Sequence, residues 1–341
     1  MGVEWAEAAE QAEKAVLGRH LRRVWALPGT ALGRSGWPPS VGQRLHWHWN
    51  YWWQSHLLDC LVDAQLRAPT QERAQLIGRF VKTVHVRNFG QWVNEYYDDI
   101  AWLGLALQRV KIVVGLDVER PLGAIDTRLR EGWTADAGGG IWWRKGDRFK
   151  NVPSNGPASI FHARQGDVEY ARALTEWMNT CLVDPDTGLV WDGLRVDTGE
   201  VVKMIYTYCQ GVFLGSCLEV SDVDSAQRTI NAVAEHCAPG GILRGQGNAD
   251  GGLFAGILAR YLALAALKLP AGPAVATARA LVLASADACW KGAVDAPGGP
   301  LFSAEWSDPA PPLPVPADNP ARDLSVQVGA WLLLEAAATL T

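Results

Sequence analysis

YYDDIAWLGLAL (96–107) places two consecutive carboxylates, Asp98 and Asp99, before an apolar run that carries no other charge. A helix that is apolar on all sides belongs inside a protein, whereas the one-sided pattern of PTQERAQLIGRFVKTV (69–84) is typical of a helix that covers a core. These neighbouring segments therefore predict an inner helix with an outer helix packed against it.

The same alternation extends along the chain. Hydrophobic periodicity and Gly/Pro punctuation predict twelve helices and little that alternates like a strand. Every second helix, beginning with the second, is rich in aromatic and small residues. The sequence thus predicts an all-α fold, an (α/α)6 barrel of six inner and six outer helices, as one domain over residues 1–341. The expected spans are 3–26, 46–67, 70–86, 96–115, 119–132, 156–165, 167–183, 203–219, 222–238, 252–268, 272–292 and 321–340.

Long segments without helical pattern separate some of these helices. They cover residues 27–45, 133–155, 184–202, 239–251 and 308–320. The first four directly precede an expected inner helix, so we expect long loops to gather over one mouth of the barrel. Loops of this length in a compact domain usually carry function.

Composition narrows the function classes. With 48% hydrophobic and 20% charged residues the chain is typical of soluble globular proteins, and a net charge of −5 argues against a nucleic-acid partner. The first thirty residues contain charges among their apolar positions, and no run has the length of a membrane span, so we expect a cytoplasmic protein without an integral membrane segment. The sequence leaves the oligomeric state open.

Metal and disulfide chemistry are not expected. The six cysteines form no CxxC pair, and His46 and His48 have no accompanying ligand pattern. We therefore predict reduced, buried thiols, no metal site and no cofactor.

The adjacent carboxylates have a chemical interpretation. Two like charges side by side favour retention of one proton, which places an acid next to a base, as glycoside cleavage requires. The alternative is a solvated helix start, where the helix dipole favours negative charge.

Aromatic and amide side chains accompany this pair. The chain has 17 tryptophans, and HWHWNYWWQSHLLDCLVDA (46–64) holds four of them within two turns, so at least one is expected to face a cavity or to pack between helices. Flat aromatic rings stack on sugars or fill a helical core. Asn50 and Gln54 share a helical face, where they could bind sugar hydroxyls or satisfy buried groups.

Later segments offer further candidates with equally open roles. Asn155 and Asp250 suit either a helix N-cap or a sugar contact. Tyr208 and Gln210 lie among small residues in an apolar helix, and Phe254 follows Asp250 by one turn.

Taken in order, several blocks resemble glycoside hydrolase family 76, the α-1,6-mannanases, in bacterial members. The resemblance runs from about residue 46 to 340. The blocks are NYWWQSHLLDCLVDA (50–64), YYDDIAWLGLAL (96–107), GGIWWRKGDRFKN with NGP (139–157), YTYCQG (206–211), DGGLFAGILARYL (250–262) and VGAWLLLEA (328–336).

This resemblance implies an (α/α)6 barrel and a retaining, endo-acting α-1,6-mannanase that hydrolyses mannan or mannooligosaccharides by double displacement. Asp98 matches the family's nucleophile and Asp99 its acid/base. The substrate-binding residues that we predict from the blocks are Asn50, Trp53, Tyr97, Trp142, Trp143, Asn155, Tyr208, Gln210, Asp250 and Phe254.

Two positions depart from the family pattern. Cys209 stands where Asn is common before Gln-Gly, and Ala255 where Lys is common after Phe. Either change could alter substrate length or linkage without removing the catalytic pair. The alternatives are a transglycosylase that uses the same Asp pair and a glycan-binding barrel without turnover.

Overall fold

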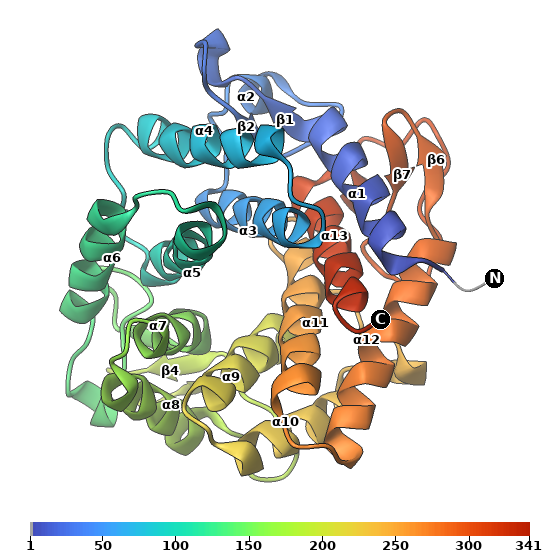
Figure 1. The fold of residues 1–341 in the computed structure, drawn as a ribbon. Helices are drawn as coiled ribbons and strands as arrows, with labels where there is room; N and C mark the ends of the chain where they lie inside the picture. Colours follow the sequence, from blue (N-terminus) through green and yellow to red (C-terminus); the bar gives the residue numbers. More distant parts are fainter. Residues whose placement is uncertain (1–2) are drawn as a thin grey trace.

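Two concentric rings of helices make up the protein (Figure 1). The computed structural model describes residues 3–341. The inner helices are α3 (Tyr51–Arg67), α5 (Tyr97–Val114), α7 (Val152–Arg164), α9 (Thr207–Glu219), α11 (Gly251–Lys268) and α13 (Leu324–Ala338). The outer helices are α1 (Trp5–His20), α4 (Gln71–Arg87), α6 (Glu119–Glu131), α8 (Val168–Leu182), α10 (Val223–His236) and α12 (Pro273–Lys291).

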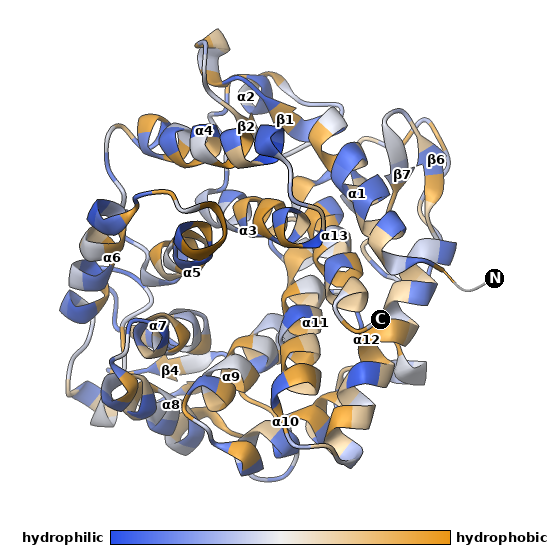
Figure 2. Cartoon of the chain, viewed as in Figure 1, coloured by the Kyte–Doolittle hydropathy of each residue, from blue (hydrophilic) through white to orange (hydrophobic). Residues whose placement is uncertain are grey.

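Each inner helix contacts the next one along the chain, and α13 returns to α3, which closes the ring. Helices α4, α6, α8, α10 and α12 each cover the inner helix that precedes them in sequence, and α1 covers α13. The predicted all-α (α/α)6 barrel, with its alternation of inner and outer helices, is therefore confirmed. Figure 2 shows the hydropathy pattern behind this alternation. The inner α11 is mostly orange (hydrophobic), whereas the outer α6 has blue (hydrophilic) turns.

Small residues let the inner helices approach closely. A Cβ atom on Gly256 of α11 would lie 2.4 Å from the carbonyl oxygen of Gly329 on α13, and one on Gly211 of α9 would lie 2.9 Å from the Cα of Leu258. Any larger side chain at these positions would push the helices apart. Large side chains such as Phe161, Phe213 and Trp331 are fully buried around these contacts.

The predicted starts of two inner helices were wrong, and the local backbone explains why. Helix α3 begins at Tyr51 rather than residue 46, because His46 and Asn50 adopt left-handed backbone conformations (φ 54° and 51°) that a helix does not accept. Helix α7 begins at Val152 rather than residue 156, with Asn151 as its cap accepting from Ser154 N at 3.2 Å.

The loops contain short elements that the sequence did not predict. A three-stranded antiparallel sheet joins β3 (Phe149–Asn151), β4 (Gly193–Arg195) and β5 (Val201–Val202), with Lys150 opposite Leu194. Two hairpin pairs join β1 (Leu21–Arg22) to β2 (Leu32–Gly33) and β6 (Val294–Ala296) to β7 (Gly299–Leu301). The remaining elements are the short helix α2 (Val41–Arg44) and 3-10 turns at Val24–Ala26, Asp136–Gly138, Pro239–Gly241 and Pro320–Arg322.

The inner helices begin at one mouth of the barrel. The N-terminal end of α3 contacts that of α11. There the indole N–H of Trp53 donates a hydrogen bond to the Asp250 carboxylate at 2.7 Å. Asp323, before α13, accepts from Ala249 N at 3.0 Å, and Trp143, before α7, reaches Asp98 on α5 at 3.0 Å. The loops that lead into these helices therefore gather over this mouth, as expected.

One helix has membrane-like composition. Helix α11 is long and apolar enough to cross a bilayer, which corrects our expectation that no run reaches that length. It belongs to the inner ring, and 61% of it is buried inside the protein. Its apolar character is that of a core helix.

Candidate active site

Asp98 and Asp99 occupy the first turn of α5, at the mouth where the inner helices begin. Negative charge is favoured there by the helix dipole. Asp98 Oδ1 accepts from the backbone N–H of Asp99 at 2.8 Å, and its Oδ2 accepts from the indole of Trp143 at 3.0 Å. Asp99 Oδ2 accepts from the amide of Asn94 at 2.6 Å. Each carboxyl is thus held in a fixed orientation by a separate partner.

The two carboxyls differ in proton affinity. Burial raises the pKa of Asp98 to about 7, while the N–H groups of Asp99 and Trp143 limit that rise by stabilising the ionised form. Burial and the neighbouring Asp98 charge hold the pKa of Asp99 well above its usual range. Asp98 therefore ionises first and Asp99 keeps its proton. Near neutral pH the pair consists of a carboxylate and a carboxylic acid.

Aromatic rings from four inner helices form a cluster beside the pair. Tyr208 of α9 stacks on Phe254 of α11 with ring centroids 4.0 Å apart and planes 17° apart. Trp52 of α3 lies 6.2 Å from Tyr208 and 6.3 Å from Phe254, and 6.4 Å from Trp102 of α5. The charge of Asp98 contributes to raising the pKa of Tyr208, which places this cluster close to the catalytic candidates. Such flat apolar faces can stack on sugar rings.

A third carboxylate completes the mouth. Asp250, at the start of α11, is exposed and accepts from two indoles, Trp52 at 3.0 Å and Trp53 at 2.7 Å. It makes no side-chain cap to α11. Its charge contributes to raising the pKa of both Asp98 and Asp99, so the three carboxyls share one electrostatic environment.

The loop before α7 delivers Trp143 to Asp98. Its backbone pairs with the start of α5, because Tyr97 N donates to Trp143 O at 3.0 Å. Lys150 is fully buried and donates to the carbonyl oxygens of Thr134, Asp136 and Gly139 at 2.9, 2.7 and 2.6 Å. Its Nζ also lies 4.5 Å from the ring centre of Trp142. One buried ammonium group thus fixes the whole turn.

Residues 3–341 contain no group of three or more His, Cys, Asp or Glu side chains placed to hold a metal ion.

Comparison with known proteins identifies the family. The sequence profile of glycosyl hydrolase family 76 matches residues 7–327. The chain belongs to glycosyl hydrolase family 76. It is a glycoside hydrolase.

Solved structures agree with this assignment. The GH76A α-1,6-mannanase of Salegentibacter sp. HEL1_6 superposes with a TM-score of 0.87 at 29% identity, covering 99% of this chain and 100% of the other. An inactive variant of that mannanase, in complex with α-1,6-mannotriose, matches with the same TM-score at 28% identity and the same coverage. The Lin0763 protein of Listeria innocua gives 0.86 at 27% identity, covering 99% and 98% of the two chains. No curated protein matches.

Three predicted substrate contacts of this family 76 protein are corrected by the structure. Asn155 is fully buried, and its amide bonds to Ile141 N at 2.7 Å, Ile141 O at 2.9 Å and Asn151 O at 2.8 Å, so it neither caps a helix nor faces sugar. Gln210 is also fully buried and pairs with both backbone groups of Val190 at 2.8 Å. Tyr97 is 5% exposed and packs against the loop at Gly132. All three hold loops in place.

The other predicted residues lie at the mouth in different ways. Trp143 and Tyr208 are half-buried, whereas Trp53, Trp142 and Phe254 are almost fully covered. Asn50 is half-buried in its left-handed turn before α3, and Gln54, its predicted face partner, bonds instead to Gly33 and Trp49 O.

Two residues of the site were not predicted from the sequence. One contacts Asp99, and the other belongs to the aromatic cluster. Asn94 donates to Asp99, and its position five residues upstream was the available signal. Trp52, rather than Trp53, stacks in the aromatic cluster.

The departures from the family 76 pattern are both buried. Cys209 is fully covered and burial holds the pKa of its thiol well above its usual range, while Ala255 is 4% exposed. Neither side chain presents a polar group to the mouth.

Proposed function

We propose that this glycoside hydrolase is an endo-acting α-1,6-mannanase that works with retention of anomeric configuration. The observation that carries the proposal is the unequal hydrogen bonding of two adjacent carboxyls beside the aromatic cluster. Asp98 accepts from two N–H groups, of Asp99 at 2.8 Å and Trp143 at 3.0 Å, which favour its charged form, whereas Asp99 accepts from Asn94 alone at 2.6 Å. A carboxylate and a carboxylic acid, side by side, are the two groups that double displacement needs.

The similarity to the Salegentibacter enzyme supports both the proposed substrate and the proposed catalytic role of the Asp98–Asp99 pair. It is an α-1,6-mannanase, and its inactive variants, with two consecutive aspartates replaced, were solved with α-1,6-mannotriose and α-1,6-mannotetrose. Asp98–Asp99 is the only pair of consecutive aspartates in the present sequence.

In the first step, a carboxylate oxygen of Asp98 attacks the anomeric carbon, and the glycosidic bond breaks as Asp99 gives its proton to the leaving oxygen. Oδ2 of Asp99 already accepts from Asn94, so the proton is carried on Oδ1. In the second step, Asp99 takes a proton from water, and that water displaces Asp98 and releases the sugar with its original configuration. Trp143 stabilises Asp98 as an anion before attack and again when it leaves.

The test is NMR of the first products from linear α-1,6-mannooligosaccharides, with wild type, Asp98→Asn and Asp99→Asn. We expect α-configured products of mixed length from wild type and none from either variant. β-Configured products would refute the nucleophile role of Asp98, and release of mannose alone would refute internal cleavage. Binding without turnover would refute the α-1,6-mannanase proposal, and products longer than the substrate would indicate transglycosylation.

An aryl α-mannobioside separates the two roles. Its leaving group needs no proton, so Asp99→Asn should retain the first step and regain turnover with azide, which replaces base-activated water. Asp98→Asn should stay inactive under both conditions. Equal behaviour of the two variants would contradict the assignment.

A further inference from the structure

Exposed apolar side chains gather on one outer face of the barrel. Within residues 3–341 fourteen large apolar side chains are exposed, and half of them come from residues 25–47 and 86–89. Single exposed apolar residues are ordinary, whereas a cluster of them marks an interaction site. We call this cluster the apolar face, and its members are Trp25, Leu27, Val41, Leu45, Trp47, Val86 and Phe89, of which Phe89 is 78%, Val41 68% and Trp47 64% exposed.

Three segments pack together to form the apolar face. The loop between β1 and β2 contacts α4, where Ala31 N donates to Thr83 Oγ1 at 2.9 Å, and Figure 1 shows α2 on the same outer side of α4. The rings of Trp25 and Phe89 lie 6.3 Å apart. The indole of Trp25 donates to Leu45 O at 2.8 Å, which joins this loop to the residues that follow α2. The apolar face is therefore one continuous surface.

A buried cation holds the exposed rings in place. Arg87 is 7% exposed, and its Nε donates to His46 O at 2.8 Å. Its guanidinium carbon lies 5.1 to 5.6 Å from the ring centres of Trp25, Trp49 and Phe89. These are cation–π distances, so one arginine fixes rings from all three segments.

Backbone strain accompanies the exposure of these rings. Trp25 and Phe89 adopt left-handed conformations, with φ of 49° and 53°, which bulky side chains rarely accept. The two unfavourable features, a strained backbone and an apolar ring in water, occur in the same residues. Strain that persists at a surface indicates a binding role for the residues that carry it.

The segments that build the apolar face carry only positive charge. Residues 15–58 and 74–94 contain eight Lys or Arg residues and no Asp or Glu, although the whole chain has a net charge of −5. Within residues 3–341 none of these eight side chains forms an ion pair with a carboxylate. Five of them are exposed, namely Arg22, Arg23, Arg44, Arg79 and Lys82.

Helix α4 places charge and apolar surface on one outward ridge. Arg79, Lys82 and Val86 follow one another at intervals of three and four residues, all three are exposed, and Phe89 continues the row. Exposed aromatic rings beside unpaired basic side chains are typical of a protein that rests on an anionic bilayer. The rings enter the headgroup level, and the cations contact lipid phosphates.

We propose that the apolar face docks this protein on the surface of a bilayer that contains anionic phospholipid. Phe89 lies five residues before Asn94, the partner of Asp99, which is at most about 18 Å along the chain. Docking therefore brings the catalytic mouth close to the membrane. It does not depend on which glycosidic bond the mouth cleaves.

The unpaired cations favour a bilayer over other occupants of the apolar face. A neutral mannan chain would stack on the rings but would leave the five exposed cations without a partner. A second copy of this chain, bound through the same face, would place like charges against one another. An anionic bilayer satisfies both the rings and the cations.

The test is co-flotation of the full protein with vesicles of phosphatidylcholine alone or with about 30% phosphatidylglycerol. We expect binding to the anionic vesicles to be at least about tenfold tighter in about 0.1 M salt, and to weaken several-fold in about 0.5 M salt, where charges are screened. No binding to the anionic vesicles, or equal binding to both kinds, would overturn the proposal.

Variants locate the contact with lipid. The double variant Trp47→Gln/Phe89→Asn removes two rings, and Asn tolerates the left-handed backbone at position 89. It should bind anionic vesicles about tenfold less tightly. Ile112→Gln, at a position that is 82% exposed and outside the apolar face, should bind like wild type.

The charge contribution has its own matched pair. Arg79→Gln on α4 should weaken binding about fivefold, because each basic residue near the surface adds about that factor. Arg120→Gln, an exposed arginine on the outer helix α6, should have no effect. All these side chains are exposed, so an unchanged thermal midpoint confirms that each variant is folded.

Three results would overturn the proposal in different ways. Undiminished binding in folded Trp47→Gln/Phe89→Asn would place the lipid contact elsewhere. Retention of wild type on insoluble α-1,6-mannan that this variant loses, without vesicle binding, would make the apolar face a sugar platform. A dimer that the variant loses, again without vesicle binding, would make it a self-association surface.

Discussion

The indole Nε1 of Trp143 donates a hydrogen bond of 3.0 Å to Oδ2 of Asp98, from a loop that lies 45 residues away in the sequence. A donor to the charged form lowers the pKa of a carboxyl group. The loop before α7 is thus connected to the ionisation of the proposed nucleophile.

Replacing Trp143 with Phe should shift the pH profile. Without the indole N–H, the pKa of Asp98 rises above its present value of about 7. Because the ionised form is the nucleophile, the acidic limb of kcat/KM should move upward by about 0.5 to 1 pH unit, with the larger loss at pH 6 than at pH 8.

The control is Trp142→Phe, which changes the neighbouring tryptophan that packs on Lys150 without touching Asp98. It should leave the limb in place. A loss in Trp143→Phe that is equal at all pH values would instead indicate that Trp143 contacts only the sugar.

Asp250→Asn should move the same limb in the opposite direction. The Asp250 charge raises the pKa of Asp98 and Asp99, and asparagine removes that charge but keeps an acceptor for the two indoles. The acidic limb should fall by about 0.3 pH unit at low ionic strength, and the difference from wild type should shrink in about 1 M salt. An unchanged limb at low salt would show that Asp250 acts on substrate alone.

The helices and the adjacent carboxylates could be predicted because both depend on local pattern. Apolar residues on all sides indicate that α5 and α11 are inner helices, and apolar residues on one side indicate that α4 is an outer helix. Both patterns can be recognised without the rest of the chain. The barrel follows from the alternation of the two kinds.

The amides could not be assigned from the sequence. A buried amide that binds a loop and one that binds sugar are the same residue type in similar surroundings, and Asn155 and Gln210 bind loops. Trp52 and Trp53 differ by about 100° around the axis of α3, and the sequence does not fix which one faces the mouth. Asn94 makes its contact through a turn whose geometry no periodicity describes.

Lys150→Met should damage both stability and catalysis. The substitution keeps the apolar stem but leaves three buried carbonyl groups without their donor. We expect a loss of about 2 to 4 kcal/mol in the free energy of unfolding. We also expect kcat/KM to fall at least tenfold at 25 °C, because the turn leads to Trp143.

Urea denaturation and steady-state kinetics measure the two effects. Lys145→Met is the matched control, since Lys145 is exposed on the same loop and should change stability by less than about 0.5 kcal/mol. Full activity in Lys150→Met would mean that the turn does not position Trp143.

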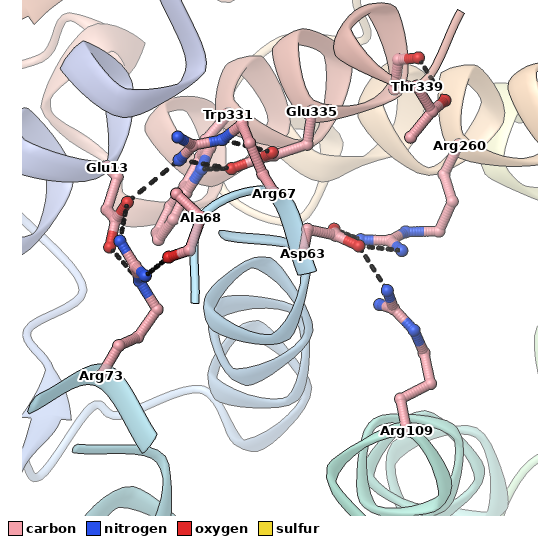
Figure 3. Close-up of polar contacts among 11 residues, drawn as sticks. Glu13, Asp63, Arg67, Ala68, Arg73, Arg109, Arg260, Trp331, Glu335 and Thr339 are labelled. Atoms are coloured by element: carbon pink, nitrogen blue, oxygen red, sulfur yellow. Dashed lines mark hydrogen bonds and ion pairs between the residues drawn. The ribbon is translucent and has the colours of Figure 1, made fainter. Parts of the chain in front are cut away.

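Arg67 joins two buried glutamates at the rear of the barrel. Its guanidinium bonds Glu335 at 3.0 Å and Glu13 at 3.1 Å, and Figure 3 shows Arg73 on the far side of Glu13. Glu335 is 4% exposed and also accepts from the indole of Trp331 at 2.8 Å. Arg67→Met leaves Glu335 buried without a cation, which should cost about 3 to 5 kcal/mol at pH 7.5.

The pH dependence tests this cause. Burial already raises the pKa of Glu335 while Arg67 opposes the rise, so the pKa climbs further in Arg67→Met. A raised native pKa means that the folded state binds more protons than the unfolded state, so stability falls as pH rises from about 4.3 through the native pKa. The loss caused by Arg67→Met should therefore be smaller at pH 5 than at pH 7.5 in urea denaturation. Lys14→Met, which breaks the exposed Lys14–Glu10 pair, should leave the free energy of unfolding nearly unchanged at both pH values. An equal loss at pH 5 and 7.5 would show that Arg67 stabilises by packing alone, because a buried, unpaired Glu335 must respond to protonation.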